Sequence, residues 1–281
     1  MPLVYPIYGF HITKPIAVGS ATVYPRTTDH QTAVDWSRDL NAYNLTGAFV
    51  TEAASDDFLF NFEAALAFVE RLDVIIGPPT LLINVDPFFQ VETLLRNGRR
   101  SGGGGEMIGK DTFFPSSRET FLRQVLHKLE DNAFCESTQF RQLFFKCVEQ
   151  FRQRTPFVEV SYFFLFSGLE TFARAVVNDR SSANAAIPIS KLLCTYGFDV
   201  AIERPADPIR AISTYAHLRN ALFHRGEFVV EINVNGTTVK FRLLEYLFNI
   251  TQLTNLVVLK AIEFDDGRIN WNSWVDRQAF K

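Results

Sequence analysis

The sequence predicts an α+β protein, with a mixed α/β N-terminal domain followed by a mainly α-helical bundle that carries an inserted β-hairpin. In residues 3–25, β-branched and aromatic residues alternate with turn formers, which is typical of short strands. Residues 117–264 contain long segments with apolar residues at helical spacing. Asn235–Gly236 lies between two runs of strand formers and is a strong hairpin signal.

The N-terminal part mixes both kinds of element. The segment 56–72 is the strongest helix, because acidic residues open it and Arg71 lies near its end. Pro78 and Pro79 break the chain after it. The other expected elements are strands within 3–25, at 47–53 and at 80–85, and helices at 32–42 and 88–96.

A glycine-rich stretch separates the two parts. Residues 97–109, "NGRRSGGGGEMIG", are typical of a flexible linker or loop. We therefore expect a mixed α/β domain at 1–100, of sensing or regulatory role, a glycine-rich linker at 101–116 and a helical domain at 117–281. Residues 1–116 are net acidic and residues 117–281 slightly basic, so a polyanion site is expected in the second part.

The helical part should be built around one buried segment. Residues 158–180 are apolar nearly all round and predict the central helix. A serine followed by a glutamate predicts a cap where the first helix begins, Asp207 and Pro208 predict another helix start, and Gly226 predicts that helix's end. The expected helices cover 117–134, 138–154, 158–180, 189–199, 207–224 and 243–264, with the hairpin between the last two.

Composition excludes several classes of protein. The chain has 281 residues, 47% apolar, with a net charge of −3, so it lacks an overall nucleic-acid-binding charge. Three irregularly spaced cysteines predict neither a disulfide framework nor a zinc site. No cluster has metal-ligand spacing, so no metal and no cofactor are expected. Without a signal peptide or a membrane-spanning run, the expected location is the cytoplasm, with no membrane partner.

One arginine stands out in the segment "HLRNALFHRG". On a helical wheel of residues 208–224, Arg219 falls within the apolar arc, whereas His217, Asn220 and His224 fall on the opposite side. An arginine on an apolar stripe is costly unless it is paired or lines a cleft. Glu170, in the apolar segment "FFLFSGLETF", is a candidate partner, and a buried structural Glu170–Arg219 pair is one interpretation.

The same residues allow a catalytic interpretation. Arg219 and His224 point about 140° apart on a regular helix. They converge in one chain only if the helix ends between them, or they meet counterparts from a second subunit across a two-fold axis. Under the structural interpretation, His224 is simply an exposed residue that favours the helix C-terminus.

"LRNALFHRGEF" resembles the signature of HEPN ribonucleases, an arginine and a polar residue followed by a histidine. "FFLFSGLETF" looks like the paired helix of that superfamily, and the closest resemblance is to the ApeA-like branch, in which a HEPN domain follows an unrelated N-terminal domain. The resemblance covers about residues 117–281. The hairpin at 228–242 departs from the simpler members, in which a helix follows the signature.

The resemblance implies a HEPN-like bundle that dimerises and cleaves RNA without a metal. His224 would act as the base, Arg219 would hold the phosphate, Asn220 would position the phosphate or the histidine, and Glu170 would fix Arg219. We therefore expect a homodimeric endoribonuclease of the defence or toxin kind, joined through its helical domain, with RNA as substrate and a protein inhibitor or trigger. The alternatives are a HEPN-fold module that binds RNA or a nucleotide without cutting, and a structural dimerisation protein.

Overall fold

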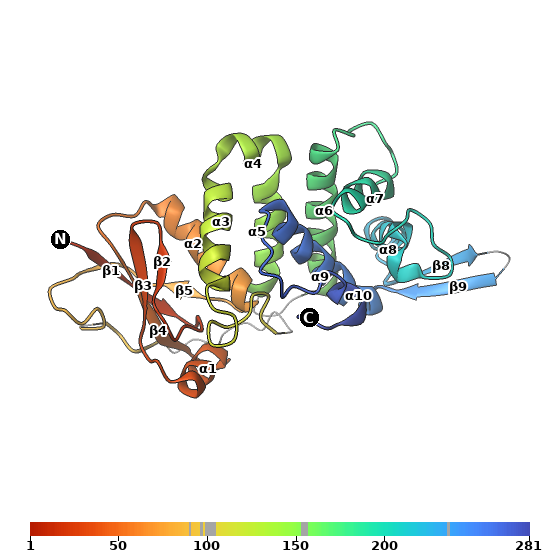
Figure 1. Cartoon of the computed structure of the whole chain (residues 1–281). Helices are drawn as coiled ribbons and strands as arrows, with labels where there is room; N and C mark the ends of the chain where they lie inside the picture. Colours follow the sequence, from red (N-terminus) through yellow and green to blue (C-terminus); the bar gives the residue numbers. More distant parts are fainter. Residues whose placement is uncertain (90, 96–97, 99–104, 153–156, 235–236) are drawn as a thin grey trace. The chain divides into compact units, whose positions relative to one another are not determined.

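The computed structural model of the chain divides into two compact units (Figure 1). The first contains Met1–Asp131 and Phe151–Thr155, and the second contains Asn132–Gln150 and Pro156–Lys281. The structure describes residues 1–89, 91–95, 98, 105–152, 157–234 and 237–281. Helices and antiparallel strands together confirm the predicted α+β class.

An antiparallel sheet forms the centre of the first unit. Its strand order is β2-β3-β4-β1-β5, while β6 pairs with β1 and β7 pairs with β4. In the central pair Leu3 lies opposite Thr51, and the register shifts between Ile7 and Tyr8. The strands are β1 (Leu3–Tyr8), β2 (Ile16–Val18), β3 (Ala21–Pro25), β4 (Tyr43–Thr51), β5 (Ile75–Ile76), β6 (Thr80–Leu81) and β7 (Leu94–Leu95).

Three helices complete the first unit: α1 (His30–Arg38), α2 (Asp56–Glu70) and α3 (Ser117–Glu130). The Ser55 hydroxyl caps α2 by accepting a hydrogen bond from the Phe58 amide at 3.2 Å. The second half of α2 is almost entirely buried, and the rings of Phe68 and Phe121 stack at 5.4 Å between α2 and α3. The predicted helix at 56–72 is therefore confirmed, with α3 packed against it.

Four expectations for this unit differ from the structure. The described residues of 88–96 form no helix, and Leu94–Leu95 instead pairs with β4. Part of the predicted linker, residues 101–104, lies outside the described residues. The rest, 105–116, belongs to the first unit, where Met107 and Ile108 are buried and the Met107 amide donates to the Val69 carbonyl of α2 at 2.9 Å. The unit boundary therefore falls near Asp131. Ser116 begins α3 without the expected side-chain cap bond.

The second unit is a helical assembly with one hairpin. Helix α6 packs against α4, α7, α8 and α9, in agreement with its predicted central place. The elements are α4 (Asn132–Thr138), α5 (Phe140–Arg152, whose last two residues belong to the first unit), α6 (Val158–Val176), α7 (Ala186–Thr195), a 3-10 turn (Pro208–Arg210), α8 (Ile212–Arg225), β8 (Val229–Val234), β9 (Thr237–Arg242), α9 (Leu243–Ala261) and α10 (Ser273–Asp276).

Burial in this unit differs from the prediction in one respect. Helix α9 is buried over most of its length, more completely than α6. The difference arises because Phe163 and Phe164 on α6 line an open groove instead of the core.

In the described part of the chain, no helix has both the length and the apolar character needed to cross a bilayer.

Helix α8 carries the signature residues and ends as predicted. It begins at Ile212, after the 3-10 turn, so Asp207 does not cap it. Gly226 adopts a left-handed conformation with φ of 67°, and its amide donates to the Leu222 carbonyl at 2.9 Å. The hairpin pairs β8 with β9, for example Val230 with Phe241, while its predicted turn at 235–236 lies outside the described residues.

Candidate functional site

The predicted contact between Arg219 and Glu170 is present. Arg219 Nη2 lies 2.6 Å from Glu170 Oε2, joining α8 to α6. The Arg219 guanidinium also lies over the ring of Phe166, with its carbon 5.1 Å from the ring centre. The side chains of Arg219 and Glu170 are 28% and 16% exposed. The pair is therefore shielded on one side but still reaches solvent.

Glu170 is shared between two arginines. Arg174, one turn further along α6, places Nε 2.9 Å from Glu170 Oε1. Its Nη1 donates to the backbone carbonyl of Ser182 at 2.9 Å and to that of Asp179 at 3.3 Å. The network of two arginines and one carboxylate thus keeps a net positive charge and is tied to the loop after α6. Sequence reasoning missed Arg174, although its i,i+4 spacing from Glu170 was a usable signal.

Asn220 contacts the arginine. Its side-chain oxygen accepts a hydrogen bond from Arg219 Nη1 at 2.9 Å. Together with the bond to Glu170, this bond orients the guanidinium plane. An arginine has five N–H donors in total, so these two bonds leave other donors for a ligand. Donors beyond these two contacts can therefore bind an oxyanion in the fixed fork geometry.

His224 is not brought to Arg219 within one chain. Helix α8 continues through both residues and ends only at Gly226, so the two side chains keep the divergence of a regular helix, about 140°. His224 is exposed in the last turn. The condition for convergence within one subunit, a helix end between the two residues, is not met.

A cavity of about 360 Å³ opens beside Arg219. Its size lies within the range of small-molecule sites. A smaller cavity next to it shares Glu203, Ser213 and His217 with it. The polar residues that line the larger cavity are Asn184, Glu203, Ser213, His217, Arg219 and Asn220.

Two further residues that line the cavity, Ser213 and Glu203, are hydrogen-bonded to each other. Ser213 is buried, and its hydroxyl donates to Glu203 Oε2 at 2.9 Å. Ser213 and His217 lie one turn apart on the polar arc of α8, a pattern visible in the sequence. Glu203 comes from the segment between α7 and α8 and had no signal in the sequence, since only the fold brings it to α8.

No metal centre is found in the described part of the chain, which holds no group of three or more potential ligands. The functional groups that line the cavity beside Arg219 are a guanidinium, side-chain amides, a hydroxyl, a carboxylate and an imidazole. Such groups can bind a phosphodiester, hold its charge and move protons.

The first unit contains a buried ionic cluster. Glu70 is fully buried and pairs with Arg118 at 2.7 Å and with Arg38 at 3.1 Å. Burial acts to raise the pKa of Glu70, but the two arginines hold it below its ordinary value. Arg118 also donates to the backbone carbonyls of His11 and Gly109. The bonds join distant segments of the fold, which is a structural role.

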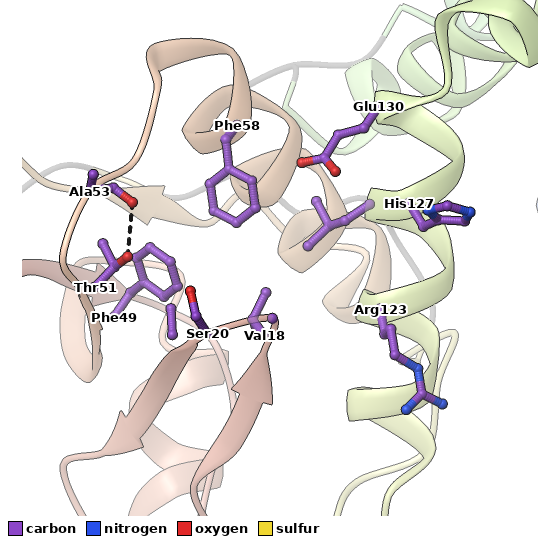
Figure 2. Close-up of a pocket in the computed structure, with 12 residues that line it drawn as sticks. Val18, Ser20, Phe49, Thr51, Ala53, Phe58, Arg123, His127 and Glu130 are labelled. Atoms are coloured by element: carbon purple, nitrogen blue, oxygen red, sulfur yellow. Dashed lines mark hydrogen bonds between the residues drawn. The ribbon is translucent and has the colours of Figure 1, made fainter.

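The first unit also contains a cavity of about 270 Å³, which lies beside α3. Figure 2 shows the rings of Phe49 and Phe58 in it, with Glu130 turned toward Phe58. The ends of Arg123 and His127 turn away from the two rings. Its charged groups do not converge on one point, so the cavity beside Arg219 is the better candidate for chemistry.

Comparison of the chain with protein-family models, with curated proteins and with solved structures finds no match.

Proposed function

We propose that the protein is a metal-independent endoribonuclease of HEPN type. The observation that carries the proposal is the arrangement of Arg219. Its guanidinium is held by Glu170 and Asn220 and lines a polar cavity at the surface. A purely structural ion pair needs neither the cavity nor the exposed Asn220 that binds the guanidinium.

The proposed reaction uses the ribose as nucleophile. His224 accepts the proton of the 2′-hydroxyl, and the 2′-oxygen attacks the adjacent phosphorus. Arg219 binds the non-bridging oxygens and offsets the charge that develops on them. The products are a 2′,3′-cyclic phosphate and a 5′-hydroxyl. Imidazole suits the role of base because it changes protonation state near neutral pH.

A homodimer completes the proposed site. Because Arg219 and His224 diverge on α8, each site takes Arg219 from one protomer and His224 from its partner. The surface proposed for the second copy is a mainly apolar groove of about 560 Å³, lined in part by Phe223, the residue before His224. Phe223 is 51% exposed there, with its ring 4.6 Å from that of Phe163. The groove is lined by Glu159 and Gly226 together with the apolar residues Val160, Phe163, Phe164, Leu222, Phe223 and Phe228.

The first test is cleavage of total RNA by the purified protein in EDTA, with His224→Ala as control. We expect cleavage that survives chelation and leaves 2′,3′-cyclic phosphate ends. Activity that EDTA abolishes and magnesium restores would contradict the mechanism.

Complementation tests the composite site. Arg219→Lys and His224→Ala are each expected to form inactive homodimers. A mixed dimer keeps one site with both residues intact, so co-refolding the two variants should restore part of the wild-type activity. Two inactive variants that stay inactive when mixed would count against the shared site.

One observation favours a second candidate. His224 is exposed and separate from the cavity that Arg219 lines, which fits a module that binds RNA or a nucleotide without cutting it. A structural dimerisation protein, in which Glu170 and Arg219 are only a core pair within each chain, is the third possibility. For the cutting enzyme we propose a cytoplasmic defence or toxin role, with the N-terminal unit responding to a protein inhibitor or trigger.

A further inference from the structure

The cavity beside Arg219 is faced by a histidine outside the signature. His217 lines it together with Arg219 and Asn220, whereas His224 does not. His217 is exposed and lies on α8, two positions before Arg219. A group bound by Arg219 in this cavity therefore has an imidazole on its own protomer close by.

The surroundings of His217 contain charges of both signs. Glu203 and Arg219 line the same cavity, and Arg204 lines the smaller one that His217 also faces. Glu203 Oε2 already accepts a hydrogen bond from the Ser213 hydroxyl at 2.9 Å. Histidine is the side chain that most often acts as a general acid or base, and His217 faces the space that Arg219 lines.

We propose that His217 is a catalytic residue that protonates the leaving group of the RNA-cleaving reaction. This inference rests on the proposed function. It names the general acid of the reaction, for which only the base, His224, has been assigned. As the 2′-oxygen forms its bond to phosphorus, the bond from phosphorus to the 5′-oxygen breaks. His224 takes the proton of the 2′-hydroxyl, and His217 gives one to the departing 5′-oxygen, so the proton count balances.

A sugar alkoxide is a poor leaving group near neutral pH, which is why an acid is needed. Proton transfer by a positioned side chain contributes a factor of about 100 to 10,000 in rate. A 4-nitrophenolate needs no such proton because it is stable as an anion. Loss of a general acid should therefore slow only the reaction with the sugar leaving group. Loss of a residue that only shapes the cavity should slow both reactions.

The test compares His217→Ala with wild type on RNA and on uridine 3′-(4-nitrophenyl phosphate). We expect a loss of roughly 100-fold or more on RNA and a loss below about 3-fold on the nitrophenyl substrate. His224→Ala should lose activity on both, because both reactions need the base. His127→Ala, an exposed histidine of α3 in the first unit, is the matched control and should change neither rate.

His217→Asn serves as a second variant, and thermal unfolding checks that each variant is folded. We expect His217→Ala and His217→Asn to have the melting temperature of the wild type. Equal losses on the two substrates in a folded His217→Ala protein would overturn the acid role and leave the proposed function intact. A wild-type protein that cleaves neither substrate would instead overturn the proposed function, and the acid role with it.

Discussion

Glu170→Gln is the most revealing single substitution, because this carboxylate holds two arginines at once. Arg219 Nη2 lies 2.6 Å from one of its oxygens and Arg174 Nε 2.9 Å from the other. Glutamine keeps the size and one acceptor but removes the charge. Its amide group turns N–H donors toward one arginine, so one of the two contacts becomes unfavourable.

The expected cost lies between two limits. Exposed ion pairs are worth about 0.2–1 kcal/mol, and removing one partner of a buried pair costs about 3–5 kcal/mol. The three side chains are only 16–28% exposed, so we expect ~1–2 kcal/mol. A melting temperature changes by about 2–4 °C per kcal/mol in a domain of this size, which gives a fall of roughly 2–8 °C.

The same change should also reduce cleavage of RNA. Arg219 would no longer be held in one orientation, and a displaced catalytic group costs up to about 100-fold in rate. The assay pairs thermal unfolding with the initial rate of cleavage in EDTA, and Glu149→Gln, an exposed glutamate of α5, is the matched control. A Glu170→Gln protein that melts and cleaves like the wild type would show that Glu170 neither stabilises the fold nor orients Arg219.

Three further predictions concern separate parts of the molecule. Arg219→Lys keeps the charge but loses the planar fork, so we expect a folded, dimeric and nearly inactive protein by light scattering and cleavage assay. Phe223→Ser should weaken the dimer while Leu244→Ser, also exposed but outside the groove, should not; equal dimer dissociation constants would argue against the groove. Burial, reinforced by Arg118, lowers the pKa of His11 to about 4. The unfolded chain therefore binds this proton first, and stability should fall by ~3 kcal/mol as pH drops from about 6.5 to 4. Denaturant titrations should show a smaller fall for His11→Phe.

Local patterns in the sequence predicted much of the fold. The helix at 56–72, the helix end at Gly226 and the hairpin depend on short-range caps, turns and periodicity, and all three were found. The Glu170–Arg219 contact was predicted because an arginine on an apolar stripe needs a partner, and few acids lie in apolar helices.

Features that depend on distant segments were not predicted. Residues 105–116 were expected to form part of a linker, yet Met107 and Ile108 are buried, and Arg118, which pairs with the distant Glu70, also donates to the Gly109 carbonyl. Leu94–Leu95 pairs with β4 in place of the expected helix, since an available strand edge outweighs a weak local preference. Glu203 reaches the cavity only through the connection between α7 and α8, which no spacing within one helix reveals.

The most direct test of the central claim is the rate of RNA cleavage by His224→Ala relative to wild type, measured in EDTA on dimers of equal melting temperature. His224 is exposed in the last turn of α8, so its removal should leave folding intact. We expect a loss of about 100- to 10,000-fold in rate. Full activity in a folded His224→Ala protein would contradict it and would leave RNA or nucleotide binding without cleavage as the function to test.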